Sequence, residues 1–116
     1  MAVRATNKIR IMLDQEIALG PGKADLLEAI QETGSISGAA RRLGMSYKRA
    51  WDLVEELNTI FGREVLSAQK GGRHGGGAQL TPVGLALVSR FRAIERAAHA
   101  AAETHLAALQ AEIAAQ

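Results

Sequence analysis

The sequence predicts a mainly α-helical fold with a small β component, a winged helix-turn-helix followed by a long C-terminal helix. Two short helical patterns separated by a glycine, between Ser35 and Asn58, predict the helix-turn-helix. A glycine-rich stretch between two short apolar segments predicts the wing, and an apolar stripe with steps of three and four predicts the last helix. The length of 116 residues fits a winged helix-turn-helix domain over residues 1–81 and a dimerisation helix over residues 82–116.

The N-terminal segment has the alternating pattern of a strand. Ile9, Ile11 and Leu13 share one side, and a turn at residues 14–15 connects them to a second strand-like segment, residues 16–19. We therefore expect a short antiparallel strand pair at the start of the fold.

A helix is expected from about Lys23 to Thr33. The Gly-Pro-Gly of residues 20–22 predicts a break before this helix, and Gly34 is placed to end it. The expected buried residues of the helix are Leu26, Leu27 and Ile30.

The helix-turn-helix prediction depends on residues that can begin and end helices. Ser37 is the expected N-cap of the first helix, and Gly44 can end it in the left-handed conformation. Ser46 is the expected N-cap of the second helix, which should run to about Phe61 and end at Gly62. The residues expected to face inward are Ala39, Ala40 and Leu43 in the first helix and Ala50, Leu53, Val54, Leu57 and Phe61 in the second.

The last part of the chain predicts a hairpin and a long helix. Two strand-like segments, residues 64–67 and 78–81, flank the loop Lys70–Gly77, and Thr81-Pro82 predicts the start of a helix that extends almost to Gln116. A helix of roughly 30 residues is about 45 Å long, more than so small a domain covers, so we expect its surplus stripe to pack on a second copy. The expected dimerisation residues are Leu87, Phe91, Ile94, Leu106, Leu109 and Ile113.

Basic residues gather in the middle third of the chain, although the net charge is only +2. A recognition helix enters the major groove by its N-terminal end, where lysine and arginine suit guanine or phosphate and Asp52 suits a cytosine amino group or orients Arg49. A cationic loop tip can follow the phosphate backbone or enter a minor groove. The expected DNA-binding residues are Ser35, Arg41, Arg42, Ser46, Tyr47, Lys48, Arg49, Asp52, Lys70, Arg73 and His74.

Alternatives stay open for three of these features. The helical pair could serve only packing, and the glycine-rich loop could be a solvated loop without a ligand. Trp51 lies at the rim of the predicted buried face, where packing against the hairpin is favoured over contact with DNA.

The sequence offers little for catalysis. It has no cysteine, its histidines are scattered at His74, His99 and His105, and GGRHGGG lacks the GxxxxGK[ST] arrangement. We therefore expect no enzymatic activity, no metal and no cofactor. The N-terminus lacks the apolar stretch of a signal peptide and no segment predicts a membrane span, so a cytoplasmic protein is expected.

Two stretches carry a resemblance to a known family. LGPGKADLLEAIQETGSISGAARRLGMSYKRAWDLVEELN and the later GGRHGGGAQLTPVG resemble the N-terminal winged-helix domain of ModE-type molybdate-responsive regulators and, at greater distance, the LysR-type winged helix. The resemblance implies a dimeric transcription regulator in which the helix from Ser46 reads operator DNA and Lys70–Gly77 forms the wing. ModE proteins also carry C-terminal oxyanion-binding domains, for which this chain has no room, so molybdate binding by this chain is not expected.

Together these features predict a sequence-specific transcriptional regulator that binds double-stranded DNA as a homodimer. The resemblance points to molybdenum-related genes. The alternative is a protein-interaction adaptor that uses the winged-helix scaffold without specific DNA binding.

Overall fold

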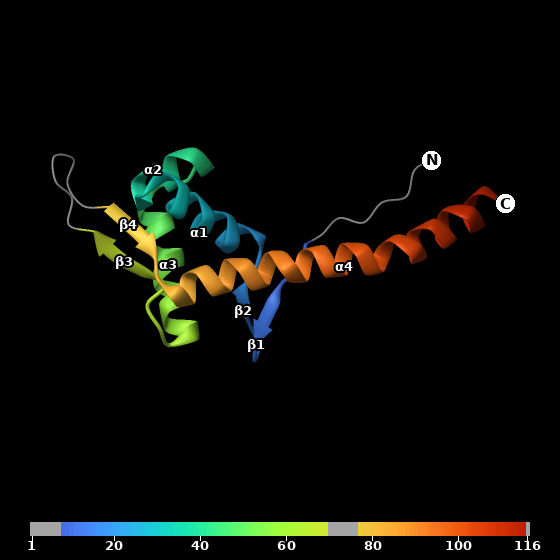
Figure 1. Ribbon diagram of the computed structural model, residues 1–116, viewed down its shortest axis with the longest axis horizontal. Coiled ribbons are helices and arrows are strands. Elements are labelled where there is room, and N and C mark those ends of the chain that lie inside the picture. The colour runs from blue at the N-terminus through green and yellow to red at the C-terminus, as the bar shows by residue number, and fades with distance from the viewer. Residues whose placement is uncertain (1–7, 70–76, 116) are drawn as a thin grey trace.

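The computed structural model describes residues 8–69 and 77–115. Along the chain lie β1 (Ile11–Leu13), β2 (Glu16–Leu19), α1 (Pro21–Thr33), α2 (Ile36–Leu43), α3 (Tyr47–Phe61), β3 (Leu66–Gln69), β4 (Gly77–Leu80) and α4 (Pro82–Ala114). Figure 1 shows α1, α2 and α3 gathered at one end of α4, with the β3–β4 hairpin beside them and the other end of α4 projecting away. The predicted winged helix-turn-helix with a long C-terminal helix is confirmed.

The core forms around α1. Leu26, Leu27 and Ile30 of this helix are completely buried, as the apolar spacing predicts. Alanines at Ala39 and Ala40 in α2 are also buried, which lets the two helices of the motif pack closely on α1. The other fully or nearly fully buried apolar residues of the core include Leu19, Ala24, Ala29, Ile36, Ala50, Leu53, Val54, Leu57, Val65, Ala78, Leu80 and Phe91.

Glycines end the first three helices, as predicted. Gly44 adopts φ 69°, a left-handed conformation that side chains disfavour, and its amide donates to carbonyl oxygens in the last turn of α2. Gly34 and Gly62 end α1 and α3 in the same conformation. The stop at Gly44 limits α2 to eight residues and lets the chain turn before α3 begins.

Two details of α2 differ from the prediction. Its N-cap is Ser35, whose Oγ accepts a hydrogen bond from the Gly38 amide at 2.9 Å, so the prediction of Ser37 was wrong. The physical reason is that the helix begins two residues earlier, with the apolar Ile36 in the core. Leu43, expected to face inward, is 36% exposed because the helix ends at the next residue.

The Gly-Pro-Gly segment is the first turn of α1 and the entry to it, where a break was expected. Pro21 occupies the first position of the helix, where its missing N–H costs nothing. Gly20 alone lies outside the helix, in an extended conformation.

Both strand pairs are antiparallel two-stranded sheets. In the first, Asp14 adopts φ 55° at the predicted turn, and Leu13 beside it is 43% exposed. In the second, Leu66 pairs with Leu80 and Gln69 with Gly77. The strands of this hairpin begin two residues later (β3) and one residue earlier (β4) than the sequence pattern suggested, since residues 64–65 belong to the connection with α3.

The first turns of α4 belong to the same core. Thr81 caps the helix through its Oγ1, which accepts a hydrogen bond from the Gly84 amide at 3.2 Å, as predicted. Phe91 is completely buried within this chain, so its side chain cannot contact a second copy, and its assignment to the dimerisation set was wrong. Leu87 is half-buried against the core. The N-terminal turns of α4, up to Phe91, are therefore part of the domain core.

Arg92 fastens α4 to α1. Its guanidinium donates to Glu28 at 2.9 Å, to Asp25 at 2.5 Å and to Glu95 at 3.0 Å, with its side chain only 23% exposed. The hydrogen bond to Glu28, followed by those to Asp25 and Glu95, raises the pKa of Arg92 above its ordinary value. The charged cluster thus fixes α4 against α1 directly beside the buried Phe91.

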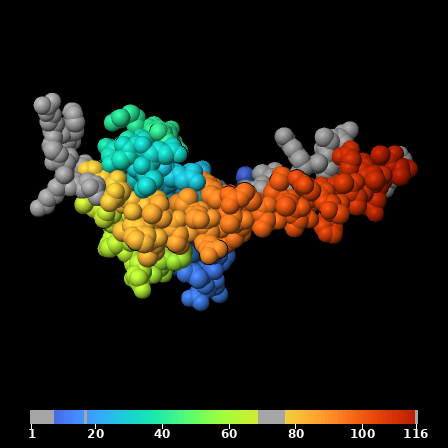
Figure 2. Space-filling model, in the orientation of Figure 1, coloured from blue at the N-terminus to red at the C-terminus, as the bar shows by residue number. Residues whose placement is uncertain are grey.

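Beyond this attachment α4 leaves the domain. The helix has 33 residues, about 50 Å of length, and none of its described residues after Phe91 is buried. Figure 2 shows its distal half extending beyond the compact body of the molecule. Exposed apolar side chains on α4 include Leu85, Ile94, Leu109 and Ile113.

Gly84→Ala is expected to destabilise the domain. A Cβ at this position would lie 2.3 Å from the Val65 backbone oxygen, which cannot move without disturbing the hairpin. Such overpacking costs about 1–3 kcal/mol of unfolding free energy. Urea unfolding followed by circular dichroism measures this loss of unfolding free energy. Gly22→Ala is the matched control, since a Cβ there meets no atom within 4 Å, and equal midpoints for both variants would contradict the close approach.

Candidate nucleic-acid interface

The turn between α2 and α3 positions the candidate interface. The Met45 amide donates to the Ala40 carbonyl at 3.0 Å, which closes the end of α2. Ser46 then caps α3, its Oγ accepting from the Arg49 amide at 3.0 Å. Because Gly44 and Met45 alone separate α2 from this cap, the first turn of α3 projects from the motif in a fixed direction.

The first turns of α3 present the predicted residues to solvent. Tyr47 is 57% exposed, and Arg49 and Lys48 are also exposed. Lys48 Nζ lies 2.9 Å from Asp52 Oδ2, so Asp52 is paired with Lys48 and does not orient Arg49 as the sequence suggested. Asp52 follows Lys48 by four positions, which places both side chains on one face of the helix and explains the pairing. Arg49 has no ion-pair partner within the described ranges.

The predicted residues of α2 lie at its two ends. Ser35 is at its start, where its hydroxyl oxygen is already engaged as the helix cap. Arg41 and Arg42 occupy the last turn, where positive charge is favoured by the helix dipole. Both are exposed, and Arg42 forms an ion pair with Glu32 of α1. Arg41 is thus the more available of the two arginines.

A hollow of about 390 Å³ separates α3 from the hairpin. Tyr47 and Trp51 line it on the α3 side, and Leu66, Ala68 and Ala78 line it on the hairpin side. Trp51 therefore lies beside the hairpin, as favoured, while remaining 44% exposed. The predicted wing residues Lys70, Arg73 and His74 lie outside the described residues.

Asn58, which the sequence did not single out, anchors the start of the β3–β4 hairpin. Its Oδ1 accepts from the Val65 amide at 2.8 Å, and its Nδ2 donates to Glu64 at 3.1 Å. On the other strand of the hairpin, β4, the Leu80 amide donates a hydrogen bond to the Gln31 Oε1 of α1 at 3.1 Å. The signal available in the sequence was an asparagine on the inner flank of a helix, where its amide needs partners.

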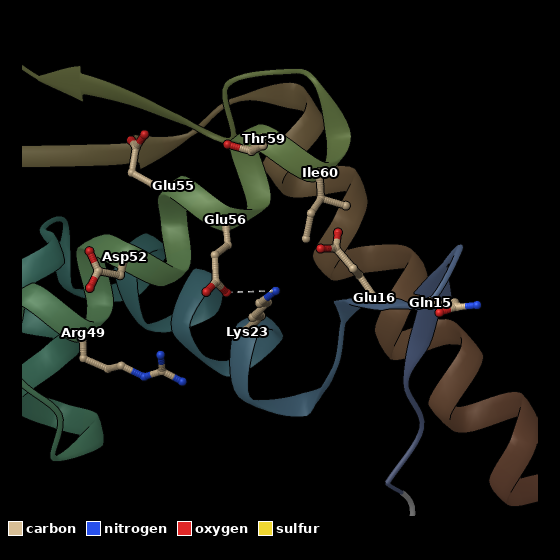
Figure 3. A pocket seen from close by; sticks show the side chains of 9 residues that line it. All are labelled: Gln15, Glu16, Lys23, Arg49, Asp52, Glu55, Glu56, Thr59 and Ile60. Atoms are coloured by element: carbon tan, nitrogen blue, oxygen red, sulfur yellow. Dashed lines mark ion pairs between the residues drawn. The ribbon is translucent and has the colours of Figure 1, made fainter.

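The opposite flank of α3 carries negative charge toward its C-terminal end. An open hollow of about 810 Å³ there is bordered by Glu16, Asp52, Glu55 and Glu56, together with Lys23 and Arg49. Figure 3 shows Lys23 paired with Glu56, while the Arg49 guanidinium points away from the carboxylates of Asp52 and Glu55. Since carboxylates repel a phosphate backbone, the face suited to DNA is the N-terminal half of α3.

Other kinds of site have less support in the described residues. Within residues 8–69 and 77–115, no group of three His, Cys, Asp or Glu side chains is placed to hold a metal ion. None of the helices in these ranges combines the length and apolar character that a membrane crossing needs.

Comparison with known proteins identifies the fold and its family. The family described as bacterial regulatory helix-turn-helix protein, lysR family, matches residues 23–85, which include the predicted helix-turn-helix at 35–58 and both strands of the hairpin. The chain belongs to this family. The β1–β2 hairpin precedes the matched residues, and most of α4 follows them.

Curated relatives share this region. The molybdenum-pterin-binding protein MopB of Rhodobacter capsulatus is 49% identical over 77 residues, which cover 66% of this chain and 28% of MopB. The molybdenum transport protein ModE of Azotobacter vinelandii is 41% identical over 88 residues, 74% of this chain and 33% of ModE. The chain thus spans about three tenths of the length of these relatives, and the resemblance to the N-terminal part of ModE-type regulators is confirmed.

A solved structure shows a similar domain with its ligand. The DNA complex of the CbnR DNA-binding domain superposes with a TM-score of 0.58 at 25% identity, covering 76% of this chain and 95% of that one. The fold of this chain is therefore that of a domain which, in CbnR, binds DNA.

Asn58→Ala is expected to loosen the wing from α3. The substitution leaves the Val65 amide without its acceptor, a loss of about 1–3 kcal/mol for a buried donor. Native-state hydrogen exchange should show faster exchange at Val65 and along β3. Thr59→Ala, a substitution at the next, exposed residue, is the control, and unchanged exchange at Val65 in Asn58→Ala would show that the wing base is held by other contacts.

Proposed function

We propose that this chain is a sequence-specific DNA-binding regulator of transcription that acts as a homodimer. The observation that carries the proposal is the exposed first turn of α3, with Tyr47, Lys48 and Arg49, on a helix-turn-helix of a bacterial regulatory family. The DNA complex formed by the similar CbnR domain supports the choice of ligand.

In this proposal α3 enters the major groove by its N-terminal end. The Arg49 guanidinium, free of carboxylates in the described structure, suits the two acceptors of a guanine edge. Lys48, whose ammonium donates a hydrogen bond to Asp52, contacts a phosphate or a base edge. The Tyr47 hydroxyl suits a phosphate oxygen. The wing residues Lys70, Arg73 and His74 are proposed, from sequence alone, to contact the backbone or a minor groove.

The relatives named ModE and MopB support a role in the control of molybdenum-related genes. For the chain itself the proposal is confined to binding DNA, without catalysis, cofactor or molybdate. A regulator of this kind acts where the chromosome lies, so we place it in the cytoplasm.

The proposed dimer forms through the distal half of α4. Ile94, Leu106, Leu109 and Ile113 recur at helical spacing on one stripe, and nothing in the described residues buries them. Pairing two such helices would shield the stripe and hold two recognition helices at a fixed separation. Operators of dimeric helix-turn-helix proteins mirror that separation in their half-sites.

Binding to DNA is expected to depend steeply on salt. The protein should bind a fragment containing the promoter beside its own gene more tightly than random DNA of equal length, by a factor of roughly 10³ or more. Fluorescence anisotropy at several salt concentrations measures both affinities. The absence of binding to either DNA at low salt would favour the protein-interaction adaptor.

Arg49→Ala and Arg73→Ala are expected to act differently. Loss of Arg49 should relax sequence preference at one base position, with a cost of about 1–3 kcal/mol. Loss of Arg73 should weaken binding to all sequences alike and lower the salt slope by about 1. Competition against a library of operator variants separates the two effects. If Arg73→Ala relaxed the sequence preference and Arg49→Ala weakened binding to all sequences alike, the base contact would belong to the loop and the backbone contact to α3.

The double variant Leu109→Asp, Ile113→Asp is expected to be monomeric. Two carboxylates on each helix would be buried without partners in the proposed interface, which is strongly unfavourable. Light scattering at micromolar concentration measures the mass. Leu85→Asp, at another exposed leucine of α4 outside the stripe, is the control and should remain a dimer. A monomeric wild-type protein would contradict the proposal.

A further inference from the structure

A third hollow, of about 380 Å³, lies where the start of α1 meets the α2–α3 turn. Its charged lining residues are Arg10, Lys23 and Arg49, and the remainder are glycine or apolar residues such as Gly22 and Met45. No carboxylate borders it. The neighbouring hollow on the same flank of α3 contains four carboxylates, so the two surfaces differ in charge although they adjoin at Lys23 and Arg49.

Two of the three cations in this hollow are available. Arg10 is exposed, and neither it nor Arg49 has a hydrogen-bonded or ion-paired carboxylate within the described ranges. The third, Lys23, is engaged with Glu56. Arg10 is held beside the start of α1, since a Cβ on Gly20 would lie 3.7 Å from the Arg10 Cγ.

The position of the hollow relates it to DNA. Arg49 belongs to the first turn of α3, and Met45 belongs to the turn before it, so the hollow is continuous with the proposed recognition surface. The β3–β4 hairpin lies on the other flank of α3, beside Trp51. A helix in the major groove has one phosphate backbone on each flank. With α3 in the major groove as proposed, the hollow would face the backbone on the side of α3 opposite the β3–β4 hairpin.

We propose that this hollow binds a phosphodiester of the DNA backbone, with Arg10 supplying a contact from outside the residues that the family matches. The matched region begins at Lys23, whereas Arg10 immediately precedes β1. The Arg10 guanidinium has no competing carboxylate in the described ranges and suits charge-assisted, bidentate hydrogen bonds to phosphate oxygens. Arg49, whose guanidinium is proposed to contact a guanine edge, adds its positive charge to the hollow. The N-terminal strand pair thus acts as an extension of the DNA-binding surface. This inference rests on the proposed function.

The first experiment is a salt titration of DNA binding by Arg10→Ala. Loss of one phosphate contact should make the slope of log affinity against log salt shallower by about 0.9 and leave the ratio of operator to random affinity unchanged. Arg96→Ala is the matched control, because Arg96 is an exposed arginine of α4 without an ion pair in the described ranges. Arg10→Lys should restore most of the slope.

The second experiment reverses charge inside the hollow. Gly22 is exposed in the first turn of α1, with no atom within 4 Å of a Cβ, so a longer side chain fits there. Gly22→Glu should weaken DNA binding at low salt, whereas Gly22→Gln, of equal shape and no charge, should bind as the wild type does. Thermal unfolding should show both variants folded, since an acidic side chain is favourable at a helix N-terminus.

Three outcomes would overturn the inference. A wild-type slope in Arg10→Ala, or equal affinities of Gly22→Glu and Gly22→Gln, would exclude a phosphate in the hollow. A loss in Arg10→Ala confined to operator DNA would make Arg10 a base contact. Failure of the wild-type protein to bind any DNA would instead refute the proposed function.

Discussion

Every functional surface of this protein depends on the burial of one helix, α1. Its Leu26, Leu27 and Ile30 are completely enclosed, and α2, α3, β4 and α4 all pack on it. Each completely buried side chain of this size contributes about 1.5–3 kcal/mol through removal from water. Because these four neighbours together bury the apolar stripe of α1, the positions of α3, the β3–β4 hairpin and α4 relative to one another are set by their packing on this helix. The rigidity that DNA recognition needs follows from this packing.

Charge then divides α3 along its length. The N-terminal half carries the exposed Tyr47, Lys48 and Arg49, whereas the C-terminal half carries Glu55 and Glu56, which border a wide hollow together with Glu16 of β2. A polyanion is attracted to the first half and repelled by the second. The modest net charge of +2 is therefore no obstacle to DNA binding, since the distribution of charge, and not its sum, orients the helix.

The long helix has two roles that meet at Arg92. N-terminal to Arg92, the buried Gly84 and Phe91 make α4 part of the domain. C-terminal to Arg92, the apolar stripe that includes Leu109 and Ile113 is exposed to solvent. The cluster of Arg92 with Asp25, Glu28 and Glu95 fastens the helix to α1 where these two parts join. In the proposed dimer this attachment would set how far apart the two recognition helices stand, because the direction in which α4 leaves the domain is fixed there.

The sequence by itself determined the two strand pairs, the helix ends at Gly34, Gly44 and Gly62, the caps at Ser46 and Thr81, and the exposed first turn of α3, because these depend on local periodicity and backbone preference. Only the tertiary structure decided the rest. It buried Phe91 within its own chain, paired Asp52 with Lys48, gave the cap of α2 to Ser35, and brought Arg10 beside Arg49. The physical reason is that a stripe of apolar residues or a row of charges does not specify its partner. Which surface covers a side chain is settled by contacts between segments far apart in the sequence, as when the packing of α1 and the α2–α3 turn brings an N-terminal arginine to the recognition helix.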